Sequence, residues 1–410
     1  MSVIGNERRL HNEPSYTLTI AGSFLYRGLA RSGPSPTTAA GYYNRGNARD
    51  DKGDHDGAIA DYTKAIEVDP RYADAYYNRG LARKAKGDLD GAIADYNRYI
   101  EIKPRDADAY YSRGNARDDK GDHDGAIADY TKAIEINPRD AAAYTNRGIA
   151  REAKDDLQGA IADYTKAIEI DPRDAKAYYN RGNARDDKGD HDGAIADYTK
   201  YIELEPRDAD AYYNRGSARY EKDDYDGAIA DFTRYIEINP HDAGAYYNRG
   251  SARYMRDDND GAIADYTKYI ELEPRDASAY FNRGNARRDK DDLDGTIADY
   301  TRAIEIDPRD ATIYNELAWL WATASKNPTR DGKKAVEYAR RAAELTKWED
   351  ANVLDTLAAA YAEAGNFDEA IKWETKALSF PEFAKSSGEE AKKRLQLYRQ
   401  RKSYRQRPPK

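Results

Sequence analysis

The sequence predicts an all-α fold, a solenoid in which helix hairpins stack one on the next. The first observation is a period of 34 residues that recurs eight times without a gap, from Ala39 to Asp310. In the second repeat, helix-compatible runs span 74–86 and 90–102; they are separated by a break at Gly87 and closed by Pro104, which cannot extend a helix. The apolar residues of the second run share one stripe that a lone hairpin cannot bury, so neighbouring hairpins must supply the core.

Residues 1–38 precede the repeats. The segment 16–26 is mildly apolar and follows Arg8 and Arg9, which is similar to a weak signal peptide, but acidic and hydroxyl residues interrupt that pattern. The competing interpretation is a relic or capping helix over about 21–31, because these residues copy the start of the repeat. We expect a cytoplasmic protein, with export as the alternative.

Landmark residues of each repeat are spaced as in a known family. In the second repeat, Tyr76, Gly80, Ala92, Tyr96 and Pro104 stand at positions 4, 8, 20, 24 and 32, counted from the first alanine of the repeat. With this spacing the chain resembles the tetratricopeptide repeat family over residues 39–310. The resemblance implies a right-handed superhelical solenoid that binds a protein or peptide in its concave groove.

The repeats depart from the family at positions 7 and 11, where arginines replace the usual leucine and tyrosine. Two like charges at i and i+4, such as Arg79 and Arg83, repel each other unless an acid lies nearby. Position 23 is aspartate in every repeat, as at Asp95. We therefore predict a repeated Arg–Asp lattice. Phosphate capture by the arginines is the less favoured alternative, because partly buried arginine usually pairs with a carboxylate.

Asparagine occupies position 6 in seven of the eight repeats, although it is a poor residue for a helix interior. A column of carboxamides can pair with the N–H and C=O groups of an extended peptide, and superhelical members of the resembled family use such a ladder. The alternative is that duplication copied an asparagine that is neutral or hydrogen-bonded within the repeat. The predicted ladder comprises Asn44, Asn78, Asn146, Asn180, Asn214, Asn248 and Asn282.

Position 5 lies on the same helix face and is mostly tyrosine. Aromatic side chains there would form walls of the groove, but packing between neighbouring repeats explains them equally well. The predicted wall residues are Tyr43, Tyr77, Tyr111, Tyr179, Tyr213 and Tyr247.

A carboxylate clamp, with which some members of the resembled family grip a peptide C-terminus, has a partial match in Asn115, Asn146 and Lys176. Tyr111 and Asn180 occupy its two other basic places. The charge needed for a dianionic terminus is therefore missing, which argues against a chaperone-tail adaptor.

The sequence changes style after Asp310. All four tryptophans lie in 311–384, where we expect two diverged hairpins, and a basic capping helix with a tail is expected in 385–410. The eight repeats carry a net charge of −16, whereas 385–410 carries +8. The acidic repeats favour an extended peptide of neutral to basic character and weigh against nucleic acid. The basic tail leaves an anionic polymer or membrane surface as an alternative partner.

We expect no enzyme and no metal or cofactor. The chain has no cysteine, and it shows no nucleophile–base pair, phosphate loop or metal-binding cluster. The predicted function is a protein-interaction adaptor. The alternative is an assembly scaffold that acts through its convex face, its tryptophan-bearing module or self-association.

Overall fold

A computed structural model describes residues 36–325 and 330–405, and in these ranges the regular elements are all helices. The helix expected over about 21–31 lies outside the described residues. None of the described helices combines the length and the apolar character that crossing a membrane would require.

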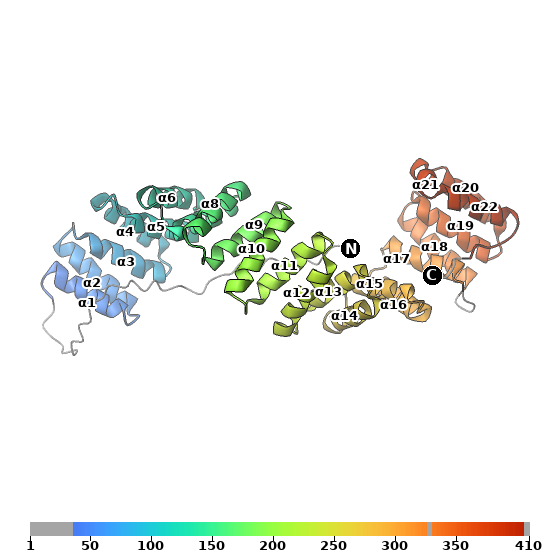
Figure 1. Cartoon of the computed structure of the whole chain (residues 1–410), viewed down its shortest axis with the longest axis horizontal. Helices are drawn as coiled ribbons and strands as arrows, with labels where there is room; N and C mark the ends of the chain where they lie inside the picture. The colour runs from blue at the N-terminus through green and yellow to red at the C-terminus, as the bar shows by residue number, and fades with distance from the viewer. Residues whose placement is uncertain (1–35, 326–329, 406–410) are drawn as a thin grey trace. The chain divides into compact units, whose positions relative to one another are not determined.

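The described residues divide into two compact units, 36–222 and those from Asp223 onward. The N-terminal unit is a row of hairpins in which the first and second helices of each repeat pack on each other and on the next repeat (Figure 1). Its helices are α1 (Ala39–Asp50), α2 (His55–Val68), α3 (Ala73–Ala85), α4 (Leu89–Ile102), α5 (Ala107–Asp119), α6 (His123–Ile136), α7 (Ala141–Glu152), α8 (Leu157–Ile170), α9 (Ala175–Asp187), α10 (His191–Leu204) and α11 (Ala209–Glu221).

The C-terminal unit continues the same helix pattern and ends in a short helix and a longer one. Its helices are α12 (Tyr225–Ile238), α13 (Ala243–Met255), α14 (Asn259–Leu272), α15 (Ala277–Asp289), α16 (Leu293–Ile306), α17 (Ala311–Thr323), α18 (Gly332–Leu345), α19 (Ala351–Glu363), α20 (Phe367–Leu378), α21 (Pro381–Ser386) and α22 (Gly388–Arg399). Each unit is thus an all-α solenoid segment of stacked hairpins, as the repeat pattern predicts.

A tight turn separates the two helices of each hairpin. In the first repeat, Gly53 adopts a positive φ of 77° and Asp54 caps the second helix, its side chain accepting a hydrogen bond from Gly57 N at 2.9 Å. In the fourth repeat Asp155 takes the left-handed conformation with φ 63°, which aspartate tolerates better than most residues. Short local bonds therefore fix the angle of each hairpin.

Close contact inside the hairpin depends on the glycine at position 8. A Cβ atom placed on Gly148 would lie 2.5 Å from the ring of Tyr164, which is fully buried. The tyrosine at position 24 is buried in the other repeats of the unit as well. Because the glycine at position 8 has no side chain, the two helices of each hairpin can approach closely enough to bury this ring.

The predicted Arg–Asp lattice is confirmed. In the fourth repeat, Asp163 is only 3% exposed and accepts two hydrogen bonds from Arg147, Nε at 2.9 Å and Nη2 at 2.7 Å, and a third from Arg151 Nη1 at 2.7 Å. Arg147 also donates to Thr131 Oγ1 of the preceding repeat at 3.0 Å. Buried aspartates paired with two arginines recur at Asp61, Asp95, Asp129, Asp197, Asp265 and Asp299.

A second buried charge cluster holds the last helix, α22, against α19 and α20. Arg394 donates to both oxygens of Asp355 at 2.9 Å, and its Nε lies 3.5 Å from Oε1 of the fully buried Glu374. The rings of Trp319 and Tyr404 each lie 5.6 Å from the guanidinium. Two carboxyl groups thus face one guanidinium, and burial together with the nearby Asp355 raises the pKa of Glu374 to about 10.

We predict that Asp163→Asn destabilises the protein strongly. The substitution keeps the shape but leaves Arg147 and Arg151 without their counter-charge, and breaking a buried ion pair costs about 3–5 kcal/mol. Urea unfolding followed by circular dichroism measures the loss. Glu169→Gln is the matched control, since Glu169 pairs with Lys166 on the surface, where an ion pair contributes less than about 1 kcal/mol. Equal losses for the two variants would contradict a stabilising lattice.

We also predict that the C-terminal module, by which we mean α17 to α22, loses stability as pH rises. Folded Glu374 retains a proton that the unfolded chain releases near its ordinary pKa of 4.5, so the free energy of unfolding falls from there up to about pH 10. Glu374→Gln should flatten this dependence and raise the melting temperature at pH 9. Tryptophan fluorescence reports this module selectively, because all four tryptophans lie within it.

The exposed Glu382→Gln serves as the control for that experiment. A wild-type melting temperature that stays constant between pH 6 and pH 9 would show that Glu374 is ionised in the folded protein.

Candidate peptide-binding face

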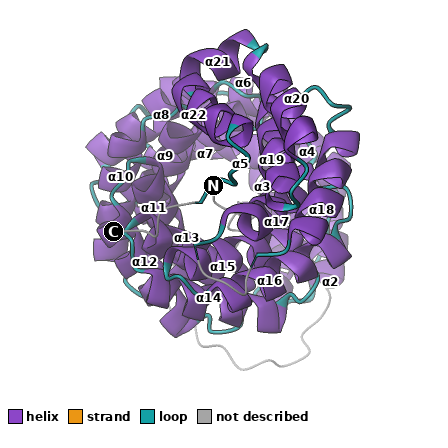
Figure 2. Ribbon diagram, turned by 90° about the vertical axis from the view of Figure 1, so that its right-hand side faces the viewer, coloured by secondary structure: helices purple, strands orange, loops and turns teal. Residues whose placement is uncertain are grey.

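The first helices of successive repeats contact one another in the N-terminal unit. Viewed end-on, α3, α5, α7 and α9 lie nearer the centre of this unit than α4, α6, α8 and α10 (Figure 2). We call the surface formed by positions 5, 6, 9, 12 and 13 of the first helices, from α1 to α9, the inner face. The arginine–aspartate pairs behind it hold these helices in place.

Three of the predicted ladder asparagines join successive repeats. Asn78 donates through Nδ2 to the hydroxyl of Tyr43 at 3.0 Å and to Oδ1 of Asn47 at 2.9 Å, both in the preceding repeat. Asn146 makes the same pair of bonds to Tyr111 at 2.9 Å and Asn115 at 3.0 Å. The third case is Asn214, with bonds to Tyr179 and Asn183. Both donors of these carboxamides are thus used between repeats.

The other predicted asparagines have different surroundings. Asn282 donates to the hydroxyl of Tyr247 at 2.7 Å, and Asn248 is completely buried. Asn44 is exposed on α1. Asn180 is half-buried and, among the residues that the structure describes, has no side-chain hydrogen bond. Asn44 likewise makes no side-chain hydrogen bond among the described residues, so Asn44 and Asn180 are the two predicted ladder residues whose whole carboxamides are unengaged.

The predicted tyrosine walls differ along the chain. Tyr43, Tyr77 and Tyr111 are half-buried, whereas Tyr179, Tyr213 and Tyr247 are buried. Each of the first three packs with a tilted ring against the buried tyrosine of its own hairpin. Burial raises the pKa of Tyr77, so its hydroxyl stays protonated and bonds to Ser112 at 3.0 Å. Aromatic surface is thus offered mainly by the first three repeats.

Two residues of the predicted partial carboxylate clamp, Asn115 and Asn146, are hydrogen-bonded to each other. Asn115 accepts hydrogen bonds at Oδ1 from Asn146 at 3.0 Å and from Tyr130 at 2.8 Å, and Lys176 is exposed in the first turn of α9. A carboxylate bound here would have to compete with the bond between the two asparagines.

The pairing of positions 6 and 9 was not anticipated from the sequence. Position 9 is asparagine in the first, third and fifth repeats, and each carboxamide also accepts a bond from a buried tyrosine, as Asn47 does from Tyr62 at 2.8 Å. Leu81 stands there in the second repeat, and the following repeat has Ser112 in place of asparagine. Asparagine is thus missing at position 9 of one repeat and at position 6 of the next, and this joint absence could have revealed that the two positions pair.

In the first, third and fifth repeats, positions 12 and 13 are both aspartate. His55 Nδ1 lies 2.7 Å from Asp50, and the pairs His123–Asp118 and His191–Asp186 repeat this contact at 2.8 and 2.7 Å. The last turns of α1, α5 and α9 therefore place acidic side chains on the inner face.

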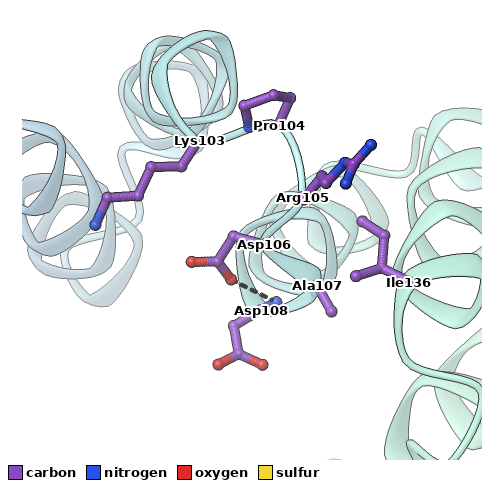
Figure 3. Close-up of a pocket in the computed structure, with 7 residues that line it drawn as sticks. All are labelled: Lys103, Pro104, Arg105, Asp106, Ala107, Asp108 and Ile136. Atoms are coloured by element: carbon purple, nitrogen blue, oxygen red, sulfur yellow. Dashed lines mark hydrogen bonds between the residues drawn. The ribbon is translucent and has the colours of Figure 1, made fainter.

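A surface depression of about 610 Å³ lies at the link between α4 and α5 (Figure 3). Asp106 accepts a hydrogen bond there from the backbone N of Asp108, and Lys103 pairs with Asp74. Burial and Asp106 raise the pKa of Asp108. The depression is lined by charged groups of both signs. Asp106 and Lys103 are bonded to neighbouring residues of the protein.

We predict that Asn146→Ala and Asn180→Ala differ in stability. The first removes two hydrogen bonds and leaves the groups on Tyr111 and Asn115 without their donor, which costs about 1–3 kcal/mol. The second removes none and adds a better helix former, so we expect a change within about 0.5 kcal/mol of zero. Urea denaturation of both variants measures the difference; equal losses would mean that Asn180 also holds repeats together.

Comparison with known proteins agrees with this architecture. Models described as TPR repeat and tetratricopeptide repeat match residues 46–87, 82–118, 107–140, 129–162, 153–186, 179–243 and 284–320. No curated protein matches the chain.

Several solved structures are similar to parts of the chain. MamA is 30% identical over 39% of this chain and 94% of its own, with a TM-score of 0.39. YrrB, a TPR protein described as having an unusual peptide-binding site, is 28% identical over 45% and 94%, with a TM-score of 0.42. A TPR repeat-containing protein from Cytophaga hutchinsonii is 22% identical over 60% and 98%, with a TM-score of 0.49. On the matching repeat models, the chain belongs to the tetratricopeptide repeat family.

Proposed function

We propose that this chain is a non-enzymatic protein-interaction scaffold that binds an extended peptide segment along its inner face. The supporting observation is the arrangement of carboxamides. The bonds of Asn78, Asn146 and Asn214 use only Nδ2, so each Oδ1 is left to accept a bond from a peptide N–H, while Asn180 offers both a donor and an acceptor. The ladder thus consists mainly of acceptors, held in place by the repeats themselves.

Rigidity favours such binding. The first helices are fixed through their arginines to buried aspartates and to the preceding repeat, as Arg147 is to Asp163 and Thr131. A face that is ordered before the ligand arrives loses little conformational entropy on binding. The acidic last turns favour a neutral to basic segment.

A second candidate is an assembly scaffold that acts through its C-terminal module. There the half-buried rings of Trp348 and Trp373 stack at 5.0 Å, with the ammonium groups of Lys372 and Lys376 over Trp373. Tryptophan is enriched in protein interfaces, and a stacked pair of half-buried rings offers apolar surface to a partner.

A random peptide library displayed on phage and selected on the intact chain tests the proposal. Synthetic versions of the selected peptides should bind Asn180→Ala about tenfold more weakly, because roughly one hydrogen bond to the peptide backbone is lost. Fluorescence anisotropy measures the affinities. Lys166→Ala on the outward helix α8 is the control and should leave them unchanged.

If the selected peptides bind Asn180→Ala as tightly as the wild type but bind the double variant Lys372→Glu and Lys376→Glu more weakly, the binding surface is the C-terminal module. Failure to select any peptide would remove the proposed function.

A further inference from the structure

Two kinds of repeat alternate along the inner face. In the first, third and fifth repeats, positions 9 and 13 are asparagine and aspartate, for example Asn115 and Asp119. In the second and fourth repeats the same positions are aliphatic, Leu81 with Ala85 and Ile149 with Ala153. Residues four apart lie side by side on a helix. The inner face is therefore acidic, apolar, acidic, apolar and acidic in turn.

The apolar patches are open to solvent. Leu81 is 38% exposed, one of only four large hydrophobic residues of this exposure among those that the structure describes, and Ala85 beside it is exposed as well. Ile149 is half-buried, packed on one side against the core around Tyr164, with the exposed Ala153 one turn further on. Each patch can accept one aliphatic side chain of a ligand.

Acidic turns flank both patches. Asp50 and Asp51 precede the first patch, Asp118 and Asp119 separate the two, and Asp186 and Asp187 follow the second. Other charged groups reach the same surface. Lys84 binds Asp119 at 2.9 Å, histidines contact one aspartate of each pair, and Glu152 accepts a bond from Tyr164 at 2.8 Å. One lysine among seven carboxylates leaves this strip acidic, and a basic ligand residue would complement it.

We propose, on the basis of the proposed function, that the inner face recognises an extended segment with two aliphatic side chains about six residues apart and a basic residue midway between them. Equivalent positions two repeats apart are separated by about 20 Å if each repeat adds a helix-packing distance of about 10 Å. An extended chain covers that length in about six residues, at about 3.3 Å per residue. Leu81 and Ile149 determine the spacing, and Asp118 and Asp119 select the charge.

A designed peptide tests this inference on the full chain. It carries two leucines six residues apart with arginine midway, in a Gly/Ser background, and a fluorescent label for anisotropy. Burying one aliphatic side chain is worth about 1.5 kcal/mol or more, so we expect about tenfold weaker binding when the leucines are three residues apart. Replacing the arginine with glutamate should weaken binding similarly.

The matched protein variants use the residue found at position 9 of the other repeats. Leu81→Asn and Ile149→Asn should each reduce the affinity five- to tenfold. Val68→Asn, which changes an exposed aliphatic residue on α2 outside the inner face, should have no effect.

Three results would overturn the inference, and they separate it from the proposed function. Equal affinity for both leucine spacings, with weaker binding to Asn180→Ala, would support peptide binding by the ladder. It would contradict the inference that Leu81 and Ile149 select the spacing of two aliphatic side chains. Equal loss in Val68→Asn and Leu81→Asn would place the peptide elsewhere. If neither the designed peptide nor any library peptide binds, both the inference and the proposed function fail.

Discussion

A buried aspartate shared by two arginines is the interaction on which the repeats of this protein depend. Asp163 pairs with two guanidinium groups and offsets the repulsion between them across one helix turn. Because Arg147 also reaches Thr131 of the preceding repeat and lies over the ring of Tyr144, the same side chain fixes the hairpin and its neighbour. The orientation of the first helices, and with it the inner face, follows from this contact.

The lattice contributes more to geometry than to net stability. Desolvation largely offsets the attraction within a buried ion pair, yet a displaced partner leaves a charge buried without compensation. Helix packing that moved Arg147 from Asp163 would therefore be strongly disfavoured. The pattern is the same in nearly every repeat, however, so it cannot distinguish one neighbour from another. The carboxamide pairs between repeats, such as Asn146 with Asn115, supply that distinction.

How far the sequence predicts the structure depends on the range of each interaction. The period, the hairpins and the Arg–Asp lattice lie within one repeat and recur, so spacing alone reveals them. Three ladder asparagines have partners in the preceding repeat, and whether the residue there is Asn115 or Ile149 decides whether the carboxamide of Asn146 or Asn180 is bonded. The contact of Arg394 with Asp355 and Glu374 joins diverged helices that share no period, so no sequence pattern pointed to it.

The alternation of asparagine and aliphatic residues at position 9 of the first five repeats makes a pair of repeats the unit by which this part of the array can change length. Loss of 107–174 would place Leu81 before Asn180, where Ile149 stands now, and the carboxamide bonds of Asn78 and Asn214 would both survive. Loss of 73–106 alone would set Asn47 against Ser112, and the carboxamide bond would disappear. We therefore expect recombination between these nearly identical segments to keep the carboxamide pairs in register only when two repeats are lost or gained together.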